Sequence, residues 1–311
     1  ASHSSPKEHT HEQKPEISTI HSLCVRILRR HAEHAGYPTR FVIVDRGEQE
    51  TTARRVLKEL KVAEATLRPA DLLARISHWK SRGIRADTVF DTLSSDADDS
   101  WDLAAAGYQR YQRLMHGVGA VDFDDLLLVV DQLFDQHETI RQQEAQRFDH
   151  VLVDEYQDTS GIQERILAAL ARDHKSLCVV GDDDQSIYGW RGAKVENILS
   201  FERDFKETKV VKLEQNYRST SNILNAANAL IKRNADRLGK NLWTDLGEGE
   251  PIFLYSAFNE NDEARYIVEN LKSWIDQGNN RQDAAVLYRS NAQSRVIESA
   301  LLQFDIPYRV Y

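Results

Sequence analysis

The fold is decided by the stretch His150-Val-Leu-Val-Asp154-Glu155-Tyr-Gln-Asp158-Thr159. A short, continuously apolar run is typical of a buried parallel strand, and open α/β sheets bind ligands at the carboxyl ends of such strands. Asp154 can anchor magnesium beside the phosphates of a nucleotide, because this ion prefers oxygen ligands and keeps much of its water. Glu155 is then placed to orient and deprotonate an attacking water. For this segment alone, an ordinary solvated strand end is the alternative interpretation.

A second strand-to-loop segment spans residues 177–192 and reads Leu-Cys-Val-Val-Gly-Asp-Asp-Asp-Gln-Ser-Ile-Tyr-Gly-Trp-Arg-Gly. Its three successive aspartates repel one another unless a cation or several N–H donors lie near them, which indicates a role in a site. Trp190 followed by Arg191, between two glycines, suits stacking on a base with a phosphate contact beside it. A partly buried core tryptophan is the alternative for Trp190.

A third segment of the same kind, Val211-Lys-Leu-Glu-Gln-Asn-Tyr217-Arg218-Ser-Thr220, again leads from a strand-like run into a helix. Tyr217 can stack on an adenine, and the permanently charged guanidinium of Arg218 can reach a phosphate. A surface ion pair with a nearby acid is the alternative for Arg218.

Around these segments the pattern is α/β. Short apolar runs alternate with amphipathic helical stretches, which predicts parallel sheets covered by helices on both faces. A helix is expected after residue 121, with Phe123 and Leu126 on its apolar face. The strand-like runs lie at residues 151–153, 177–180, 210–213, 252–255 and 284–288.

Two further regions have a different character. Residues 48–115 carry apolar side chains at helical spacing with no convincing strand, so they predict an all-helical block whose most mobile loop is the acidic stretch 94–100. Residues 1–16 have too few apolar side chains to order themselves and predict a disordered tail. Its histidines favour a solvated tail over a metal site, since no cysteine or carboxylate frame surrounds them; they are His3, His9 and His11.

The composition narrows the class of protein. The chain has 311 residues with 41% hydrophobic and 29% charged positions, enough for two globular domains. Its net charge of −9 excludes a uniformly basic nucleic-acid coat protein, so any contact with DNA or RNA must come from a local groove. The longest apolar run, residues 126–130, is too short to cross a membrane, and no secretion signal is apparent, so we expect a cytoplasmic protein. Cys24 and Cys178 are expected to be buried, reduced thiols.

The three segments, in this order and at this spacing, resemble motifs II, III and IV of the UvrD/Rep/PcrA family of superfamily 1 DNA helicases. The similarity extends to Ser18-Thr-Ile-His-Ser22 (motif Ib), to the run from Gly119 to Leu126, and to the run from Leu287 to Arg295 (motif IVa). It covers roughly residues 17–311.

The resemblance implies RecA-like P-loop NTPase motor domains with an inserted all-helical subdomain. After the tail at 1–16, motor domain 1A would comprise 17–22 and 116–213, the helical insertion 1B would comprise 23–115, and 214–311 would form the first part of motor domain 2A. It also implies 3′ to 5′ movement on single-stranded DNA, driven by ATP and Mg²⁺, with unwinding of the duplex in DNA repair or replication. The implied partners are single-stranded DNA, duplex–single-strand junctions and repair or replication proteins, without a membrane.

Site residues follow from the same resemblance. It implies Asp154 on magnesium, Glu155 as the catalytic base, Gln185 as the sensor of the γ-phosphate, Tyr217 on the adenine and Arg218 as the arginine finger. Trp190 would stack on a base of the tracking strand. The other residues implied near single-stranded DNA are Thr19, His21, Tyr188, Arg191, Arg289 and Asn291.

The sequence lacks several motifs of the family. The most important is the P-loop, whose pattern Gly-x-x-x-x-Gly-Lys-Ser/Thr occurs nowhere in it. The family's Q motif, motif Ia, subdomain 2B and motifs V and VI are also missing. We therefore expect a truncated or partial helicase that is inactive alone and has an exposed core face. The alternative is a non-enzymatic remnant that binds single-stranded DNA or a partner protein, and an in-frame P-loop upstream of the first codon would distinguish the two.

Overall fold

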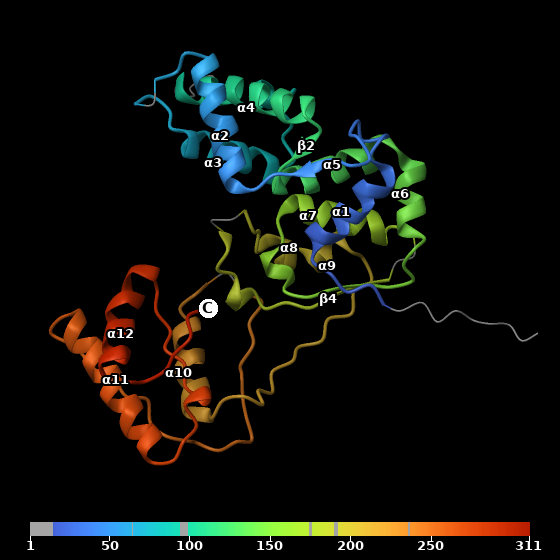
Figure 1. Ribbon diagram of the computed structural model, residues 1–311. Coiled ribbons are helices and arrows are strands. Elements are labelled where there is room, and N and C mark those ends of the chain that lie inside the picture. Colours follow the sequence, from blue (N-terminus) through green and yellow to red (C-terminus); the bar gives the residue numbers. More distant parts are fainter. Residues whose placement is uncertain (1–14, 64, 94–98, 174–175, 190–191, 236) are drawn as a thin grey trace, which may run out of the picture. The chain divides into compact units, whose positions relative to one another are not determined.

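A computed structural model describes residues 15–311, except 64, 94–98, 174–175, 190–191 and 236. The chain divides into two compact units, shown as ribbons in Figure 1. Unit 1 runs to Leu213 and also takes in Arg233–Lys240, whereas unit 2 consists of Glu214–Lys232 and Asn241–Tyr311. The expected tail lies outside the described residues apart from its last two positions, and most of the acidic loop at 94–100 lies outside them too.

Four helices form the body of unit 1 around a shared apolar core. The hydroxyl of Thr19 accepts the N–H of Ser22 and so begins the first of them, while Asp122 and Asp125 form a reciprocal capping box at the start of another. Their buried faces meet through side chains such as Ile27 and Ile162. The helices are α1 (Ile20–His31), α5 (Phe123–Gln136), α6 (Glu138–Ala145) and α7 (Gly161–Ala171).

A helical lobe with its own core covers the region that the sequence predicted to be helical. Gly107 lets two helices approach closely, since a Cβ there would lie 2.8 Å from a methyl carbon of Leu72. The described residues between 48 and 115 contain no strand, which confirms the helical expectation for that part of the chain. The lobe consists of α2 (Arg46–Glu59), α3 (Pro69–Ser81), the short 3-10 helix η1 (Val89–Thr92) and α4 (Asp99–Gly117).

The core of this lobe begins at Val44 and ends at Ala120. Helix α1 packs with α5 in the core of the body, where its buried residues, among them Cys24 and Ile27, face the other helices of the body. The division of the chain into 1A, 1B at 23–115 and 2A stays a prediction.

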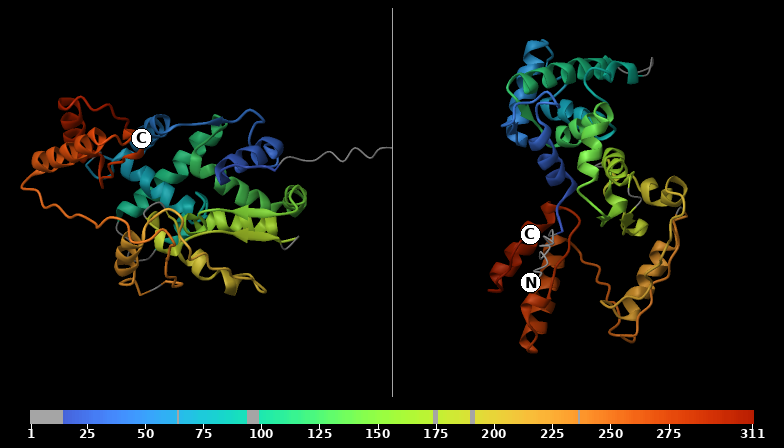
Figure 2. Two further views of the ribbon diagram at one scale, coloured as in Figure 1. Left: turned by 90° about the horizontal axis from the view of Figure 1, so that it is seen from below. Right: turned by 90° about the vertical axis from the view of Figure 1, so that its right-hand side faces the viewer.

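Two short parallel sheets complete unit 1. Strands β1 (Val42–Ile43) and β2 (Ala120–Val121) pair where the chain enters and leaves the lobe. Strands β3 (Val151–Val153) and β4 (Leu177–Val179) lie side by side in Figure 2, with Leu152 opposite Cys178. Two short helices follow β4, namely α8 (Glu196–Leu199) and α9 (Phe201–Asp204).

The mixed α/β class is confirmed, but the expected sheets are much reduced. Residues 210–213, 252–255 and 284–288 are described and form no strand, because a strand needs a neighbour for its N–H and C=O groups. The sheet of β3 and β4 is also not covered on both faces, since Leu152 is 75% exposed. Cys178, on that same open face, is exposed, so the expectation of two buried thiols is wrong for this residue and right for Cys24.

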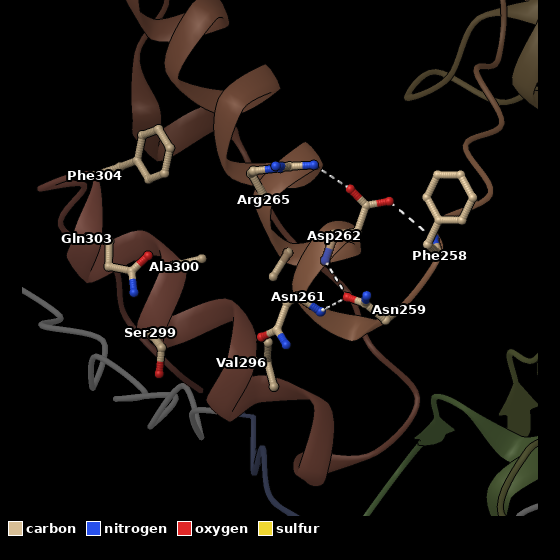
Figure 3. Close-up of a pocket in the computed structure, with 11 residues that line it drawn as sticks. Phe258, Asn259, Asn261, Asp262, Arg265, Val296, Ser299, Ala300, Gln303 and Phe304 are labelled. Carbon is tan, nitrogen blue, oxygen red and sulfur yellow. Dashed lines mark hydrogen bonds and ion pairs between the residues drawn. The ribbon is translucent and has the colours of Figure 1, made fainter.

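The regular structure described in unit 2 is helical, and the unit has a small core. Two of its helices pack together around Val268, Leu301 and Ile306. A cavity of about 490 Å³ lies between them and is lined by Phe258, Arg265 and their neighbours (Figure 3). The helices of this unit are α10 (Ser221–Ile231), α11 (Glu260–Asp276), the 3-10 helix η5 (Arg281–Asp283) and α12 (Asn291–Gln303).

Within the described ranges, no helix combines the length and the apolar character that a membrane span requires.

Candidate functional site

The carboxyl end of β3 presents two carboxylates on a tight turn. Asp154 accepts the backbone N–H of Glu155 at 2.9 Å, and Glu155 adopts a left-handed conformation with φ +51°. Such a φ is uncommon for a residue other than glycine and costs free energy, so the surrounding turn must hold it. Both side chains are exposed, as a site for a diffusing ligand requires.

A buried glutamine connects this turn to the loop after β4. The side chain of Gln157 donates to Glu155 Oε2 at 2.7 Å, and its Oε1 accepts the N–H of Asp182 at 3.0 Å. Gly181 is needed for this approach, because a Cβ there would lie 2.7 Å from that same Oε1. Gln157 is only 1% exposed, so its side chain is held in place by the surrounding protein, and its two hydrogen bonds fix the two loops against each other.

The three aspartates after β4 form a compact turn, the 3-10 helix η3 (Asp183–Gln185). Asp182 begins it by accepting the N–H of Asp184 at 3.0 Å, and it also accepts the side-chain amide of Gln185 at 2.7 Å. Burial raises the pKa of Asp182, but hydrogen bonds from Lys240 and Gln185 outweigh it and hold the pKa below its ordinary value. The cations that the acidic run required are therefore present.

Those cations, Arg237 and Lys240, were missed by the sequence analysis. Arg237 lies 53 positions beyond its partner Asp184, and no short-range pattern signals such a pairing. The only hint in the sequence was the like-charge repulsion among the aspartates, which demanded partners without naming them.

A cavity of about 390 Å³ brings four of the expected site residues together. It is lined by Thr19 and His21 at the start of α1 and by Asp154 and Glu155 after β3. Burial lowers the pKa of His21, so this side chain favours its neutral form. Residues implied for DNA and residues implied for the nucleotide thus line one hollow of unit 1.

The lining of this cavity suits a hydrated magnesium ion with phosphates. Burial and the charge of Glu155 raise the pKa of Asp158, and its buried Oδ1 has no hydrogen-bond partner among the described residues. The described residues contain no group of three or more histidine, cysteine or acidic side chains arranged to hold a metal by themselves. Magnesium takes one or two protein carboxylates and completes its shell with water and phosphate oxygens, so the exposed carboxylates of Asp154 and Glu155 could hold such an ion.

The remaining expected residues of unit 1 lie on the loop after β4 or outside the description. Gln185 and Tyr188 are exposed on that loop and are not among the residues that line the cavity. Trp190 and Arg191 lie outside the described residues.

In unit 2, the residues of the third segment lie at the start of α10. The side chain of Asn216 accepts the N–H groups of Arg218 and Ser219 at 2.9 and 2.8 Å, which forms the turn into the helix. Tyr217 is 79% exposed, and its hydroxyl donates to the Gln215 side chain at 2.7 Å. An exposed ring is free to stack on a base.

Arg289 and Asn291 lie at the start of α12 in the same unit, and both are exposed. Between them, Ser290 forms a capping box with Gln293, whose side chain also accepts the N–H of Arg289 at 3.0 Å. The helix start thus has a defined geometry that presents both side chains to solvent.

One exposed aromatic residue near His21 was misplaced by the sequence analysis. Phe123, expected on the buried face of α5, is 56% exposed, and its ring centre lies 6.2 Å from that of His21. As the first residue of the helix it precedes the buried stripe, a position that the apolar period does not distinguish. The pair offers an aromatic surface beside the cavity.

Two parallel strands, each ending in an acidic loop, bring the expected carboxylates of unit 1 together, and comparison with known families assigns the chain to the superfamily 1 DNA helicases. Residues 4–206 match the model of the UvrD/REP helicase N-terminal domain, and residues 211–311 match that of the UvrD-like helicase C-terminal domain. The chain belongs to the UvrD/REP helicase family.

Curated relatives agree with this assignment. The chain is 46% identical over 295 residues to DNA helicase II of Haemophilus influenzae and to that of Escherichia coli. It is 42% identical over 292 residues to the ATP-dependent DNA helicase PcrA of Staphylococcus aureus. These alignments cover 94–95% of the chain, which spans about 40% of the length of each relative.

Proposed function

We propose that this chain is part of an ATP-dependent helicase that moves 3′ to 5′ on single-stranded DNA and unwinds duplex DNA in repair or replication. The observation that carries the proposal is the Gln157 bridge, which holds the carboxylate pair after β3 against the Asp182–Gln185 turn. Two strand ends joined in this way can contact the same nucleotide, because ligands bind at the carboxyl ends of parallel strands. Family membership supports the same conclusion.

The proposed nucleotide is ATP with Mg²⁺, which neutralises charge on the phosphates when bound. Asp154 would hold the ion, and Glu155 would take the proton of the attacking water. Gln185 would contact the γ-phosphate. Tyr217 would stack on the adenine, and Arg218 would act as the arginine finger.

For DNA, we propose contacts from both units. Thr19 and His21 would lie near the strand at the start of α1, and Trp190 would stack on a base. The other proposed contacts are Tyr188, Arg191, Arg289 and Asn291. Single-stranded DNA and duplex–single-strand junctions are the proposed partners, together with repair or replication proteins.

In domain terms, we propose that the body and the β3–β4 sheet belong to motor domain 1A and that the helical lobe is insertion 1B. The separate core of the lobe, from Val44 to Ala120, supports that division. Unit 2 would then be the first part of motor domain 2A.

Binding of single-stranded DNA tests the proposal on the 311-residue chain. Trp190→Ala should weaken binding roughly 5- to 150-fold, because stacking of a base on an aromatic ring is worth about 1–3 kcal/mol. Fluorescence anisotropy with a labelled oligonucleotide at low salt measures this. Phe90→Ala, at a partly exposed ring of the lobe, is the matched control and should bind like the parent. Equal affinity of Trp190→Ala and the parent would refute the assigned contact.

Hydrolysis of ATP should be negligible in this chain, because it contains no P-loop lysine and no P-loop backbone N–H groups to hold the phosphates against Asp154 and Glu155. DNA-stimulated turnover at roughly 1–100 per second would contradict that expectation. In a longer form that includes a P-loop, Glu155→Gln should keep nucleotide binding and lose most turnover, since an amide cannot take the proton.

A further inference from the structure

A basic segment from the far side of α10 packs against the aspartate turn. Arg233–Lys240 belongs to unit 1 by its contacts, although the chain on either side of it belongs to unit 2. Its last four residues read Arg237-Leu-Gly-Lys240, and we call them the basic segment. The resemblance to the helicase family implied no role for these residues.

Every aspartate of the turn has a partner in the basic segment. Arg237 Nε donates to Asp184 Oδ1 at 2.8 Å, and its Nη2 forms an ion pair with the other oxygen. The backbone N–H of Leu238 donates to Asp183 Oδ2 at 2.8 Å. Lys240 forms an ion pair with Asp182. A two-pronged arginine contact is more directional and stronger than a single ion pair.

These ion pairs are largely shielded from solvent. The side chains of Arg237 and Asp184 are 16% and 10% exposed, and those of Lys240 and Asp182 are 19% and 22% exposed. Removing a cation from such a place leaves a poorly hydrated carboxylate beside two others, which costs far more than losing a surface ion pair.

The basic segment is itself held in shape. Lys212 Nζ donates to the carbonyl oxygens of Leu238 and Gly239 at 3.2 and 2.8 Å. Within the segment, Arg237 Nη2 donates to the carbonyl of Lys240 at 3.2 Å. The two cations therefore approach the turn from a defined loop.

Asp182 connects the basic segment to the proposed catalytic residues. One of its carboxylate oxygens pairs with Lys240, and the other accepts the side-chain amide of Gln185 at 2.7 Å. Its backbone N–H is held by Gln157, which also donates to Glu155. A continuous set of contacts thus runs from Lys240 through Asp182 to Gln185 and Glu155.

We propose that Arg237 and Lys240 are positioning residues that hold the Asp182–Gln185 turn and so orient Gln185 and, through Gln157, Glu155. The inference rests on the proposed function for what Gln185 and Glu155 do, but the positioning itself is a property of the chain. Without these cations, the three carboxylates repel and the turn opens.

The test compares Lys240→Ala and Arg237→Ala with the parent in the 311-residue chain. Hydrogen–deuterium exchange of the amides of Asp184 and Gln185 should accelerate roughly 10- to 100-fold in each variant, because hydrogen bonds to charged groups are lost. Lys209→Ala removes an exposed lysine elsewhere in unit 1 and should leave this exchange unchanged. Unchanged exchange in both test variants would overturn the proposal.

Two further measurements separate positioning from general destabilisation. Lys240→Arg should restore protection at Gln185, and the exchanged pair Asp184→Arg with Arg237→Asp should restore it better than either single change. The side-chain amide signal of Gln185 in ¹⁵N-correlated NMR spectra should shift in Lys240→Ala and return in Lys240→Arg. The side-chain amide of Gln163, which takes part in the cap of α7, should not move. If neither Lys240→Arg nor the exchanged pair restored the exchange protection of Gln185, the cations would only stabilise the fold, and the positioning role would be refuted.

The outcome is independent of the proposed function. If the parent chain fails to bind single-stranded DNA while the rescues succeed, the proposed DNA contacts of this chain fail and the positioning role stands. If binding persists while exchange at Gln185 is insensitive to both cations, the positioning role fails and the helicase assignment stands.

Discussion

The helical lobe of unit 1 and the α11–α12 pair of unit 2 are built from similar elements but differ in how much they bury. In the lobe, Val56, Leu72 and Tyr108 are completely buried within one extended cluster. In unit 2, the cluster between α11 and α12 buries three described residues, Val268, Leu301 and Ile306. Phe253 and Leu254, in the same unit, are 79% and 97% exposed.

The difference shows that helical segments can bury their apolar side chains with neighbours close in the sequence, whereas strand-like segments cannot do so without a second strand. A helix satisfies its own backbone hydrogen bonds, so α2, α3 and α4 need only one another to bury their apolar faces. A strand-like run needs a second strand beside it, and the runs at 210–213, 252–255 and 284–288 have none in the described part of the chain. Their apolar side chains therefore remain largely exposed.

The largest expected effect is at the buried charges that join the lobe to the body. Lys80 Nζ on α3 lies 2.7 Å from both Asp122 Oδ2 and Asp125 Oδ1, and all three side chains are buried. Lys80→Ala should lower the free energy of unfolding by about 3–5 kcal/mol, because it leaves two buried carboxylates without their cation. Exchange protection of the lobe amides, followed with urea, measures the loss.

The matched control for this change is Lys80→Met combined with Asp122→Asn and Asp125→Asn. It removes the charges together and keeps similar volumes, so it should recover most of the stability. If Lys80→Ala lowered the free energy of unfolding by less than about 1 kcal/mol, these buried charges would contribute no more than a surface ion pair, and the expected difference between the two regions would be wrong.

The same leucine-to-alanine substitution should reduce stability by different amounts in the two cores. Leu72→Ala, in the middle of the lobe, should cost about 2–5 kcal/mol, as buried leucines generally do. Leu301→Ala should cost less, near the lower end of that range, because its small cluster can collapse around the gap. Urea unfolding of the two variants tests this, and equal costs would mean that the cores are packed alike.

Asp125 at the lobe junction and Asp262 in unit 2 should contribute to the pH dependence of stability with opposite sign. Burial and the charge of Asp122 raise the pKa of Asp125 to about 6, so the folded lobe junction holds a proton that the unfolded chain has released. Its contribution to stability is therefore present at low pH and falls as the pH rises from the ordinary value of 3.8 through 6. Asp125→Asn should remove that fall.

Asp262 in unit 2 provides the opposite case. The N–H of Phe258 and the hydroxyl of Tyr255 lower its pKa, so its contribution is present above the ordinary pKa and is lost on acidification. The contributions are isolated by comparing exchange protection between pH 3 and pH 7 in the parent and in each variant. Asp125→Asn should remove a loss of protection that occurs as the pH rises, and Asp262→Asn should remove a loss that occurs as the pH falls. The same sign in both regions would contradict the assignment.

The smallest expected effect is at an exposed ion pair of unit 2. Arg265 is 63% exposed and lies 2.6 Å from Asp262 (Figure 3). Arg265→Ala should change stability by no more than about 0.5 kcal/mol, because solvent screens the pair. Thermal unfolding at low and high salt measures this, and a loss as large as that expected for Lys80→Ala would remove the distinction between the two regions.

Much of the candidate site could be predicted from the order of residues. The Asp154–Glu155 pair after an apolar run and the acidic turn after a second run led to the helicase family, because strand ends and their spacing are local properties. The helices of 48–115 were equally accessible, since the apolar period of a helix is written within a few turns of chain. That residues 252–255 and 284–288 form no strand could not be predicted, because apolar alternation shows that a segment could pair but not whether a neighbour is available.

Contacts between distant residues were decided only in three dimensions. The sequence showed that Asp182, Asp183 and Asp184 needed compensation, while the fold supplied Arg237 and Lys240 from beyond α10. It also placed Lys80 between Asp122 and Asp125, although nothing in the pattern of α3 marks a buried lysine. The physical reason is that desolvated charges must find opposite charges wherever the chain brings them, and sequence separation does not limit that choice.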